Sequence, residues 1–308
     1  MLRAVVSGAT SFLGSSVAEA LLANGYEVYG LVRTSSGARH FLPRHPRFYE
    51  ISCDITETAL WTEAIGRADC FFHFAWGGPG ISGRADADLQ YKNVLDTLEC
   101  IHAAKALGVR RFLFAGSQAE YGKVRGITTE QTPCHPILEY GKNKYRVYQR
   151  ASRLAGELGM EYVHARIFSV YGPKDHPYTL IPVCIRGFLS GETIQLSTCA
   201  QKWNFLHVND AARALVRLGE CDLHGCNPVV VNVASSDTRV LKSFVEEIHR
   251  LCGNRGSCAY GSRQVDEEPV DNWPDIGLLQ SLIGVQKEVS FEDGIAELIE
   301  INLREMER

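Results

Sequence analysis

Three side chains of this sequence have the types and spacing needed to move a proton together with a hydride: Ser117, Tyr140 and Lys144. Tyr140 and Lys144 stand four residues apart, so on a helix they share one face, with Cβ atoms about 5–6 Å apart. A nearby ammonium favours tyrosinate over tyrosine, so we expect the pKa of Tyr140 to lie below its ordinary value of about 10. Tyr140 would then serve as a general acid or base. This spacing is common by chance, so its meaning depends on the elements around it.

The amino-terminal residues predict an element that binds phosphate. Residues 3–7 read as a short buried strand, and the turn 8–14 (Gly-Ala-Thr-Ser-Phe-Leu-Gly) leads into a helical pattern at 15–22. Free backbone N–H groups and the helix dipole attract a phosphate at such a helix start. Ser11 takes the place of the usual central glycine. On its own, this turn is equally compatible with an ordinary connection between a strand and a helix.

The composition is that of a soluble globular protein. The 308 residues are 45% hydrophobic and 22% charged, and the net charge of −4 gives no electrostatic case for binding nucleic acid or an anionic membrane. The ten cysteines include no Cys-x-x-Cys pair, and the ten histidines no His-x-x-x-His pair, so we expect no metal site. Without a signal peptide or an apolar run of about 18 residues, the protein is expected to be cytoplasmic.

Strand and helix patterns alternate along the first half of the chain. After the first unit, strand patterns recur at 27–32, 49–53, 70–74, 111–115, 161–166 and 229–233. This alternation predicts an α/β fold, a Rossmann-type doubly wound parallel sheet with helices on both faces. We expect residues 1–168 to form the dinucleotide-binding domain, rejoined by about 204–236. Residues 169–203 and 237–308 would form a smaller C-terminal substrate-binding lobe.

Taken together, the motifs resemble the extended short-chain dehydrogenase/reductase family, which contains nucleotide-sugar epimerases, dehydratases and ketoreductases. The resemblance covers nearly the whole chain. It rests on the turn 8–14, Asp54-Ile55, His73-Phe-Ala75, Asn93-Val94, Ser117 with Tyr121-Gly122, Tyr140-Gly-x-x-Lys144, Arg166 before Val170-Tyr-Gly-Pro173, and Asn204-Phe-Leu-His-Val-Asn-Asp210.

The resemblance implies a role for each of the three opening residues. Ser117 would orient the reacting oxygen of the substrate, and Tyr140 would exchange its proton. Lys144 would lower the pKa of Tyr140 and hold the nicotinamide ribose. We expect no catalytic role for His73, which reads equally well as a packed core histidine.

Two sets of binding residues also follow from the resemblance. The cofactor is expected to meet Gly8, Thr10, Ser11, Phe12, Leu13, Gly14, Arg33, Ser36, Asp54, Ile55, Phe74, Ala75, Asn93, Tyr140, Lys144 and Ile167. The substrate is expected to meet Trp76, Gln118, Ser169 and Trp203, although a core position for Trp203 stays open. Ser169 replaces a common asparagine. Lys202-Trp203-Asn204-Phe205 replaces the more usual Arg-Asp-Phe, which puts the arginine contact to the diphosphate in doubt.

The end of the second strand indicates the cofactor. NAD-binding proteins place an acidic residue there to accept the ribose hydroxyls, whereas this chain has Val32 followed by Arg33-Thr-Ser-Ser36. Arginine and hydroxyl groups can hold a 2′-phosphate that a carboxylate would repel. The sequence therefore favours NADP(H), with NAD(H) left open.

The expected reaction is NADPH-dependent reduction of the C4 ketone of a nucleotide-linked 4-keto-6-deoxy sugar, with Tyr140 as proton donor. The combined motifs look most like 4-ketoreductases such as CDP-abequose synthase. Dehydratases of the family carry Asp-Glu where this chain has Gln118-Ala119, so dehydration is disfavoured. Two alternatives stay open: a nucleotide-sugar 4-epimerase with retained NAD+, and a non-catalytic NADP-binding regulator. The resemblance also implies a homodimer that pairs the helices near 89–104 and 140–158.

Overall fold

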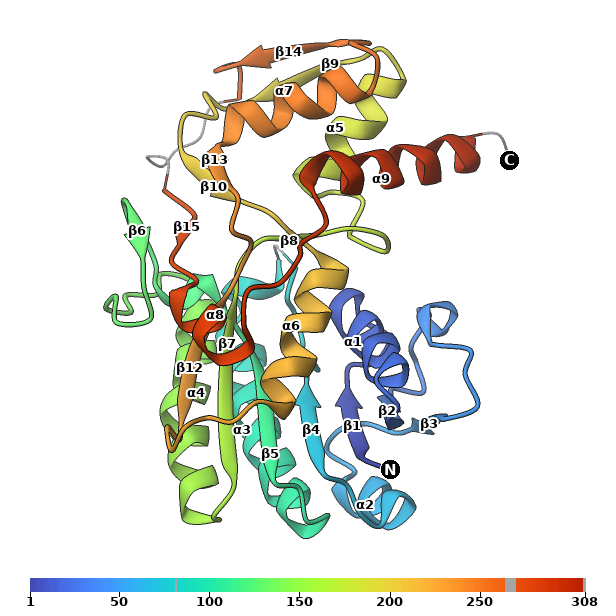
Figure 1. The fold of residues 1–308 in the computed structure, drawn as a ribbon, viewed down its shortest axis with the longest axis vertical. Coiled ribbons are helices and arrows are strands. Elements are labelled where there is room, and N and C mark those ends of the chain that lie inside the picture. Colours follow the sequence, from blue (N-terminus) through green and yellow to red (C-terminus); the bar gives the residue numbers. More distant parts are fainter. Residues whose placement is uncertain (81, 264–269, 307–308) are drawn as a thin grey trace.

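The computed structural model describes residues 1–80, 82–263 and 270–306. Its centre is a sheet of seven parallel strands in the order β12-β7-β5-β4-β1-β2-β3 (Figure 1). The strands are β1 (Arg3–Ser7), β2 (Glu27–Val32), β3 (Phe48–Ser52), β4 (Cys70–His73), β5 (Arg111–Ser117), β7 (Glu161–Ile167) and β12 (Val229–Val233). The order reverses between β1 and β4, and in such sheets ligands bind outside the carboxyl ends of the strands at that crevice.

Helices cover both faces of the sheet because successive strand residues point to opposite sides. Ala4 and Val6 of β1 belong to one apolar core with α1 (Phe12–Ala23), α6 (Val208–Glu220) and α8 (Gly277–Ile283). Val5 belongs to the core on the other face, with α2 (Thr58–Ile65), α3 (Ala87–Ala106) and α4 (Glu139–Glu157). The predicted doubly wound α/β fold is confirmed, and the strand patterns agree with the observed strands to within about two residues at each end.

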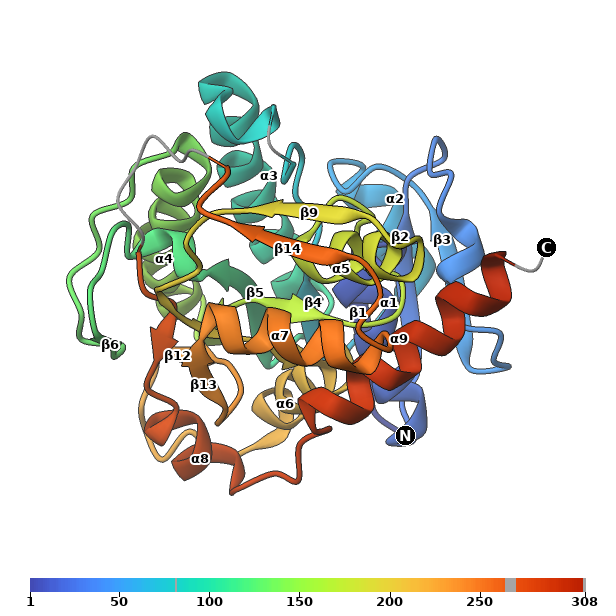
Figure 2. The ribbon, with the colours of Figure 1, turned by 90° about the horizontal axis from the view of Figure 1, so that it is seen from above.

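The remaining elements form a smaller lobe beyond the carboxyl ends of the strands (Figures 1 and 2). It contains α5 (Leu180–Leu189), α7 (Leu241–Leu251) and α9 (Phe291–Met306), with the paired strands β9 (Thr193–Leu196) and β14 (Ser257–Tyr260). Strands β10 (Lys202–Asn204) and β13 (Thr238–Val240) pair antiparallel. Shorter pairs are β8 (Val170–Tyr171) with β11 (Leu206–His207), and β6 (Ile127–Thr128) with β15 (Trp273–Pro274). The short 3₁₀ helices are η1 (Arg39–Phe41), η2 (Gly83–Ala85) and η3 (Gln118–Glu120).

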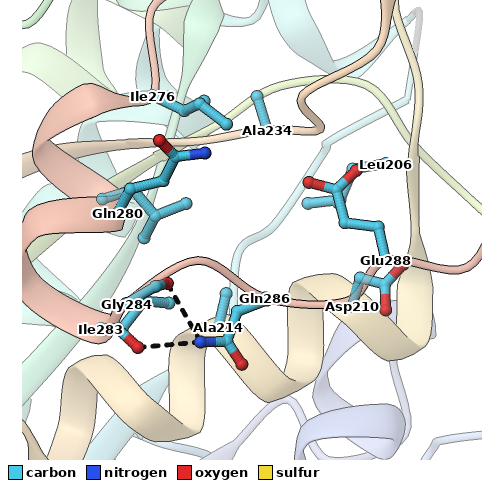
Figure 3. Close-up of a pocket in the computed structure, with 11 residues that line it drawn as sticks. Leu206, Asp210, Ala214, Ala234, Ile276, Gln280, Ile283, Gly284, Gln286 and Glu288 are labelled. Atoms are coloured by element: carbon cyan, nitrogen blue, oxygen red, sulfur yellow. Dashed lines mark hydrogen bonds between the residues drawn. The ribbon is translucent and has the colours of Figure 1, made fainter.

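Helix α8 lies against the sheet and not in the smaller lobe. Leu279 and Ile283 pack into the core shared with α1 and α6, although the sequence division assigned all of 237–308 to the lobe. A cavity of about 30 Å³ lies between α6 and α8, which is room for about one water molecule (Figure 3). None of the residues predicted to do chemistry lines it. In the part of the chain that the structure describes, every helix is too short or too polar to span a bilayer.

Candidate active site

Ser117 and Tyr140 meet where β5 ends and α4 begins. The Ser117 hydroxyl is near enough to the Tyr140 phenol to act against the rise of its pKa. The Ser117 Oγ also accepts a hydrogen bond from the Ala119 N–H at 3.2 Å, which fixes the hydroxyl at the start of η3. The two elements approach closely because of Gly141, where an added Cβ would lie 2.4 Å from the Ala119 carbonyl oxygen. The predicted pair is therefore brought together by the close approach of the backbone at Gly141 and Ala119.

Lys144 lies one turn further along α4 and is almost completely buried, with 4% of its surface exposed. Its Nζ donates a 2.7 Å hydrogen bond to the Ala115 carbonyl oxygen. The ammonium lies 3.8 Å from the centroid of the Trp76 ring and 4.6 Å from that of Phe114. Burial lowers the pKa of Lys144 to about 7, and the Glu120 carboxylate partly opposes this shift. Both the charged and the neutral form of Lys144 are therefore populated near neutral pH.

The expectation of a lowered pKa at Tyr140 is wrong. Desolvation raises the pKa of Tyr140, although the nearby Ser117 hydroxyl and the charge of Arg84 act in the opposite direction. The Lys144 Nζ lies 5.7 Å from the centroid of the Tyr140 ring and is directed to Ala115. Lys144 therefore lies near Tyr140, but the hydrogen bond of its ammonium goes to the Ala115 carbonyl oxygen and not to the phenol.

The segment between β4 and α3 borders Tyr140 on another side. The Trp76 ring meets the Tyr140 ring edge-on, with centroids 6.2 Å apart. The Trp76 Nε1–H donates to the Gln90 side-chain oxygen at 2.8 Å. Asn93, buried in α3, accepts a hydrogen bond from the Gly77 N–H at 2.7 Å and donates one to the Gly77 carbonyl at 3.0 Å. Asn93 therefore organises this loop, which places the Trp76 ring beside Tyr140.

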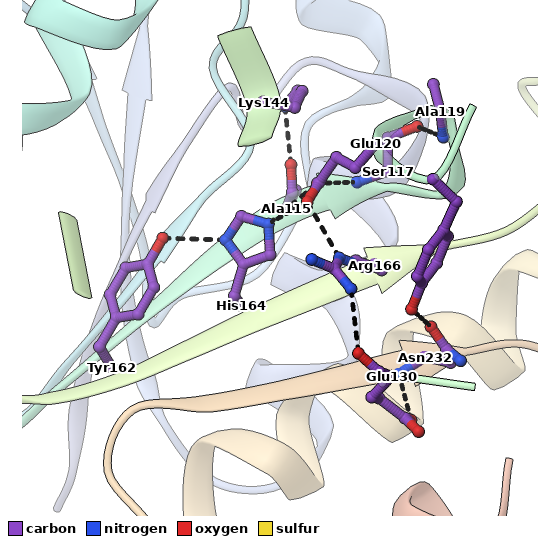
Figure 4. Close-up of polar contacts among 11 residues, drawn as sticks. Ala115, Ser117, Ala119, Glu120, Glu130, Lys144, Tyr162, His164, Arg166 and Asn232 are labelled. Atoms are coloured by element: carbon purple, nitrogen blue, oxygen red, sulfur yellow. Dashed lines mark hydrogen bonds and ion pairs between the residues drawn. The ribbon is translucent and has the colours of Figure 1, made fainter. Parts of the chain in front are cut away.

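Behind Ser117 lies a fully buried polar network (Figure 4). The Glu120 carboxylate accepts hydrogen bonds from the Ser117 N–H at 2.8 Å and from the Arg166 Nε–H at 3.0 Å. It also lies 2.9 Å from His164 Nε2, while His164 Nδ1 pairs with the Tyr162 hydroxyl at 3.0 Å. Interaction with His164 and Arg166 holds the pKa of Glu120 below its ordinary value despite the burial. Glu120 is fully buried, and its bond to the Ser117 N–H stabilises the turn that carries Ser117.

The network was not identified from the sequence. Arg166 was noted only as part of a motif, and His164 and Tyr162 were read as parts of a strand. Residues 164 and 166 point to the same face of β7, as alternate residues of a strand do. That face lies beside Glu120, and only the pairing of β7 with β5 brings them together.

The turn 8–14 has the shape of a dinucleotide phosphate site. Gly8 has a positive φ of 69°, and a Cβ there would lie 2.8 Å from the Ala75 nitrogen; at Gly14 it would lie 2.3 Å from the Gly8 carbonyl oxygen. Ser11 is the N-cap of α1, with its hydroxyl accepting from the Gly14 N–H at 3.0 Å. The N–H groups of Phe12 and Leu13 have no acceptor within the helix, as in any first turn, and they remain for a phosphate. These residues fit the cofactor implied by the resemblance.

The end of β2 carries positive charge and no carboxylate. Val32 is buried, and Arg33 is exposed directly after it. Arg39 donates to the carbonyl oxygens of Arg33, Thr34 and Ser36, and it pairs with the Glu50 carboxylate at 2.8 Å, which offsets its charge. The Ser36 hydroxyl donates to the Thr10 hydroxyl at 3.1 Å and thereby joins this segment to the phosphate turn.

The other predicted contacts lie at neighbouring strand ends. Asp54 is exposed after β3 and accepts hydrogen bonds from the Thr56 N–H and hydroxyl, at 3.0 and 2.8 Å, which lower its pKa. Its neighbour Ile55 and the residues Phe74, Ala75, Gln118 and Ile167 are buried or half-buried at the carboxyl edge of the sheet. His73 is a packed core histidine, hydrogen-bonded to Ser7 and Thr97.

The two remaining substrate candidates lie toward the smaller lobe. The Ser169 hydroxyl accepts a hydrogen bond from the Asn272 side chain at 3.0 Å. Trp203 is half-buried against the apolar core of the lobe and pairs with Arg239 across β10 and β13. Among the described residues there is no group of three or more metal-ligating side chains.

Comparisons with known proteins identify the family. The profile of the NAD dependent epimerase/dehydratase family matches residues 4–234. The chain belongs to this family. The expected resemblance is confirmed at that level, whereas the narrower likeness to 4-ketoreductases is not shown.

Known members of the epimerase/dehydratase family match this chain over nearly all of its length. A UDP-glucose 4-epimerase of Mycolicibacterium smegmatis is 26% identical over 327 residues, covering 97% of this chain and 98% of its own. The structure of MoeE5 in complex with UDP-glucose and NAD has a TM-score of 0.83 and 25% identity, with 99% of this chain and 100% of that chain covered. The UDP-glucose 4-epimerase of Thermotoga maritima, solved with UDP-glucose, has a TM-score of 0.88 at 22% identity and covers 99% of this chain and 100% of its own.

Proposed function

We propose that the protein is a nucleotide-sugar 4-epimerase that acts on a UDP-linked sugar. The observation that carries this proposal is the placement of Ser117 beside Tyr140, with Lys144 buried on the same helix, in a member of the epimerase/dehydratase family. Relatives of at least 25% identity that match most of the chain are named as UDP-glucose 4-epimerases. This was the alternative reading of the sequence, and it now has better support than 4-ketoreduction.

The residues suit the proton transfers that such a reaction needs. A bound nicotinamide dinucleotide supplies the hydride acceptor and donor. Tyr140 takes the proton of the C4 hydroxyl when the sugar is oxidised. It returns the proton to the C4 oxygen after the keto sugar has rotated to present its other face. Ser117 donates a hydrogen bond to the same oxygen. The water-eliminating acid and base of a dehydratase have no counterpart, because Glu120 is buried and held by His164 and Arg166.

The test is conversion of UDP-glucose to UDP-galactose by the purified protein with no reduced cofactor added. Wild type should reach an equilibrium mixture of the two sugars. Tyr140→Phe should fold and bind cofactor but lose at least about 10²-fold in kcat, the usual contribution of a positioned acid–base group. Absence of conversion of any UDP-sugar tried would refute the proposal.

One observation favours a 4-ketoreductase as the second candidate. The end of β2 presents Arg33 where a NAD-binding protein has a carboxylate, and this cation suits the 2′-phosphate of NADPH. Oxidation of NADPH on addition of a nucleotide-linked 4-keto-6-deoxy sugar, with no epimerase activity, would support this candidate.

We also infer that two copies associate through α3 and α4. Tyr91 and Leu95 of α3 are each 43% exposed, and a surface hollow between the two helices is lined by Leu95, Leu98, Glu99, His102, Arg150 and Leu154. Apolar side chains that gather on one exposed helix pair commonly mark an interface.

A further inference from the structure

A second cation lies against the catalytic tyrosine, and the sequence gave no reason to single it out. The guanidinium carbon of Arg84, in η2, lies 4.9 Å from the centroid of the Tyr140 ring. The ammonium of Lys144 lies further away, at 5.7 Å, and donates to the Ala115 carbonyl. Arg84 is thus the nearer of these two cations to the ring of Tyr140.

The position of Arg84 depends on a tightly built loop. Its Nε–H donates to the Pro79 carbonyl at 2.7 Å. The buried side-chain amide of Gln90 lies 3.3, 3.0 and 2.8 Å from the carbonyl oxygens of Gly77, Gly78 and Gly83. A Cβ at Gly83 would lie 2.5 Å from the Gly78 Cα, so the two ends of the loop touch in a way that requires glycine.

Gln90 links this loop to the other neighbour of the tyrosine. Its side-chain oxygen accepts from the Trp76 indole, and Trp76 meets Tyr140 edge-on. One buried amide therefore places an aromatic ring and a guanidinium around the same phenol.

We propose that Arg84 is a positioning residue for proton transfer, which holds the Tyr140 ring in place and stabilises its phenolate form. This inference rests on the proposed role of Tyr140. Among the described residues, the cations of Arg84 and Lys144 lie near the Tyr140 ring, and the Ser117 hydroxyl and the Glu120 carboxylate also act on its ionisation. Glu120 opposes the phenolate and Arg84 favours it. A cation over an aromatic face also attracts the neutral ring.

The test compares Arg84→Gln and Arg84→Lys with wild type in the protein loaded with NAD+. The ionisation of Tyr140 is followed without substrate, as the ultraviolet phenolate absorbance that is lost in Tyr140→Phe. Removing one partly solvated charge at this distance should raise the titration midpoint of Tyr140 by about one pH unit. The pH at which kcat rises should increase by the same amount as the titration midpoint. At neutral pH, kcat should fall roughly 3–10-fold, while KM should change less than about twofold. Arg84→Lys should restore part of the shift.

The matched control is Arg153→Gln, which removes an exposed arginine of α4 paired with Glu157 and should leave the titration unchanged. An unmoved Tyr140 titration in Arg84→Gln would overturn the inference. A loss confined to KM for substrates with an anionic sugar would overturn it too, since Arg84 would then bind substrate. If the titration shifts but wild type epimerises no UDP-sugar, the proposed function fails while the link between Arg84 and Tyr140 stands.

Discussion

Replacing Lys144 with methionine should change how the stability of the cofactor-free protein depends on pH. The lysine is 4% exposed and its pKa falls from 10.5 to about 7 on folding. Above about pH 7 the native lysine loses its proton, while the unfolded chain keeps it up to about pH 10.4. The unfolded state then binds more protons, so the free energy of unfolding rises with pH. The cost of burying the charge is therefore fully present below pH 7 and is relieved above it.

The size of the effect follows from the shift. Each pH unit within the window contributes about 1.4 kcal/mol, so the wild type should gain roughly 2–3 kcal/mol relative to Lys144→Met between about pH 6 and 9. Urea unfolding of both proteins at several pH values measures this, because other titrating groups cancel in the difference. A difference that stays constant over this range would refute the reasoning, since the ammonium would then remain charged in its pocket.

Three further substitutions test the packing around the site and the proposed dimer interface. Gly116→Ala should lower the free energy of unfolding in urea by about 1–3 kcal/mol and reduce activity, because the new Cβ would lie 2.6 Å from His164 Nε2 and 2.7 Å from Glu120 Oε1. The control is Gly37→Ala, whose added Cβ meets nothing within 4 Å. Equal effects of the two substitutions would contradict the geometry. Glu120→Gln should cost roughly 3–5 kcal/mol of unfolding free energy by leaving Arg166 buried without its carboxylate, and an unchanged urea midpoint would disprove this. Leu95→Glu on α3 should convert a dimer to a monomer in analytical ultracentrifugation; a monomeric wild type would disprove the proposed interface.

The fold could be predicted because its signals are local. Each strand of the sheet is a short apolar run, and the glycine turn at 8–14 is followed at once by a helix. The positions of Ser117 and Tyr140 could also be predicted, because each stands at the end or the start of such an element. The position of α8 was not predicted correctly. Its apolar side chains could pack into the core of the sheet or into that of the smaller lobe, and only tertiary packing decides between the two.

The electrostatics of the site could not be read from spacing. The pKa of Tyr140 is set by burial, by Ser117 and by Arg84, and Arg84 reaches it from a loop more than fifty positions earlier in the chain. A polar residue such as Gln90 in a helix gives no sign that it will organise a glycine loop.

The most direct test of 4-epimerisation follows the hydrogen at C4. UDP-glucose carrying deuterium at C4 is incubated with the purified protein in ordinary water, without added reduced cofactor. The account predicts UDP-galactose that retains the deuterium at C4, because the hydride leaves and returns within one active site while only the hydroxyl proton passes through Tyr140. No epimer, or an epimer whose C4 deuterium has been replaced by solvent hydrogen, would contradict it.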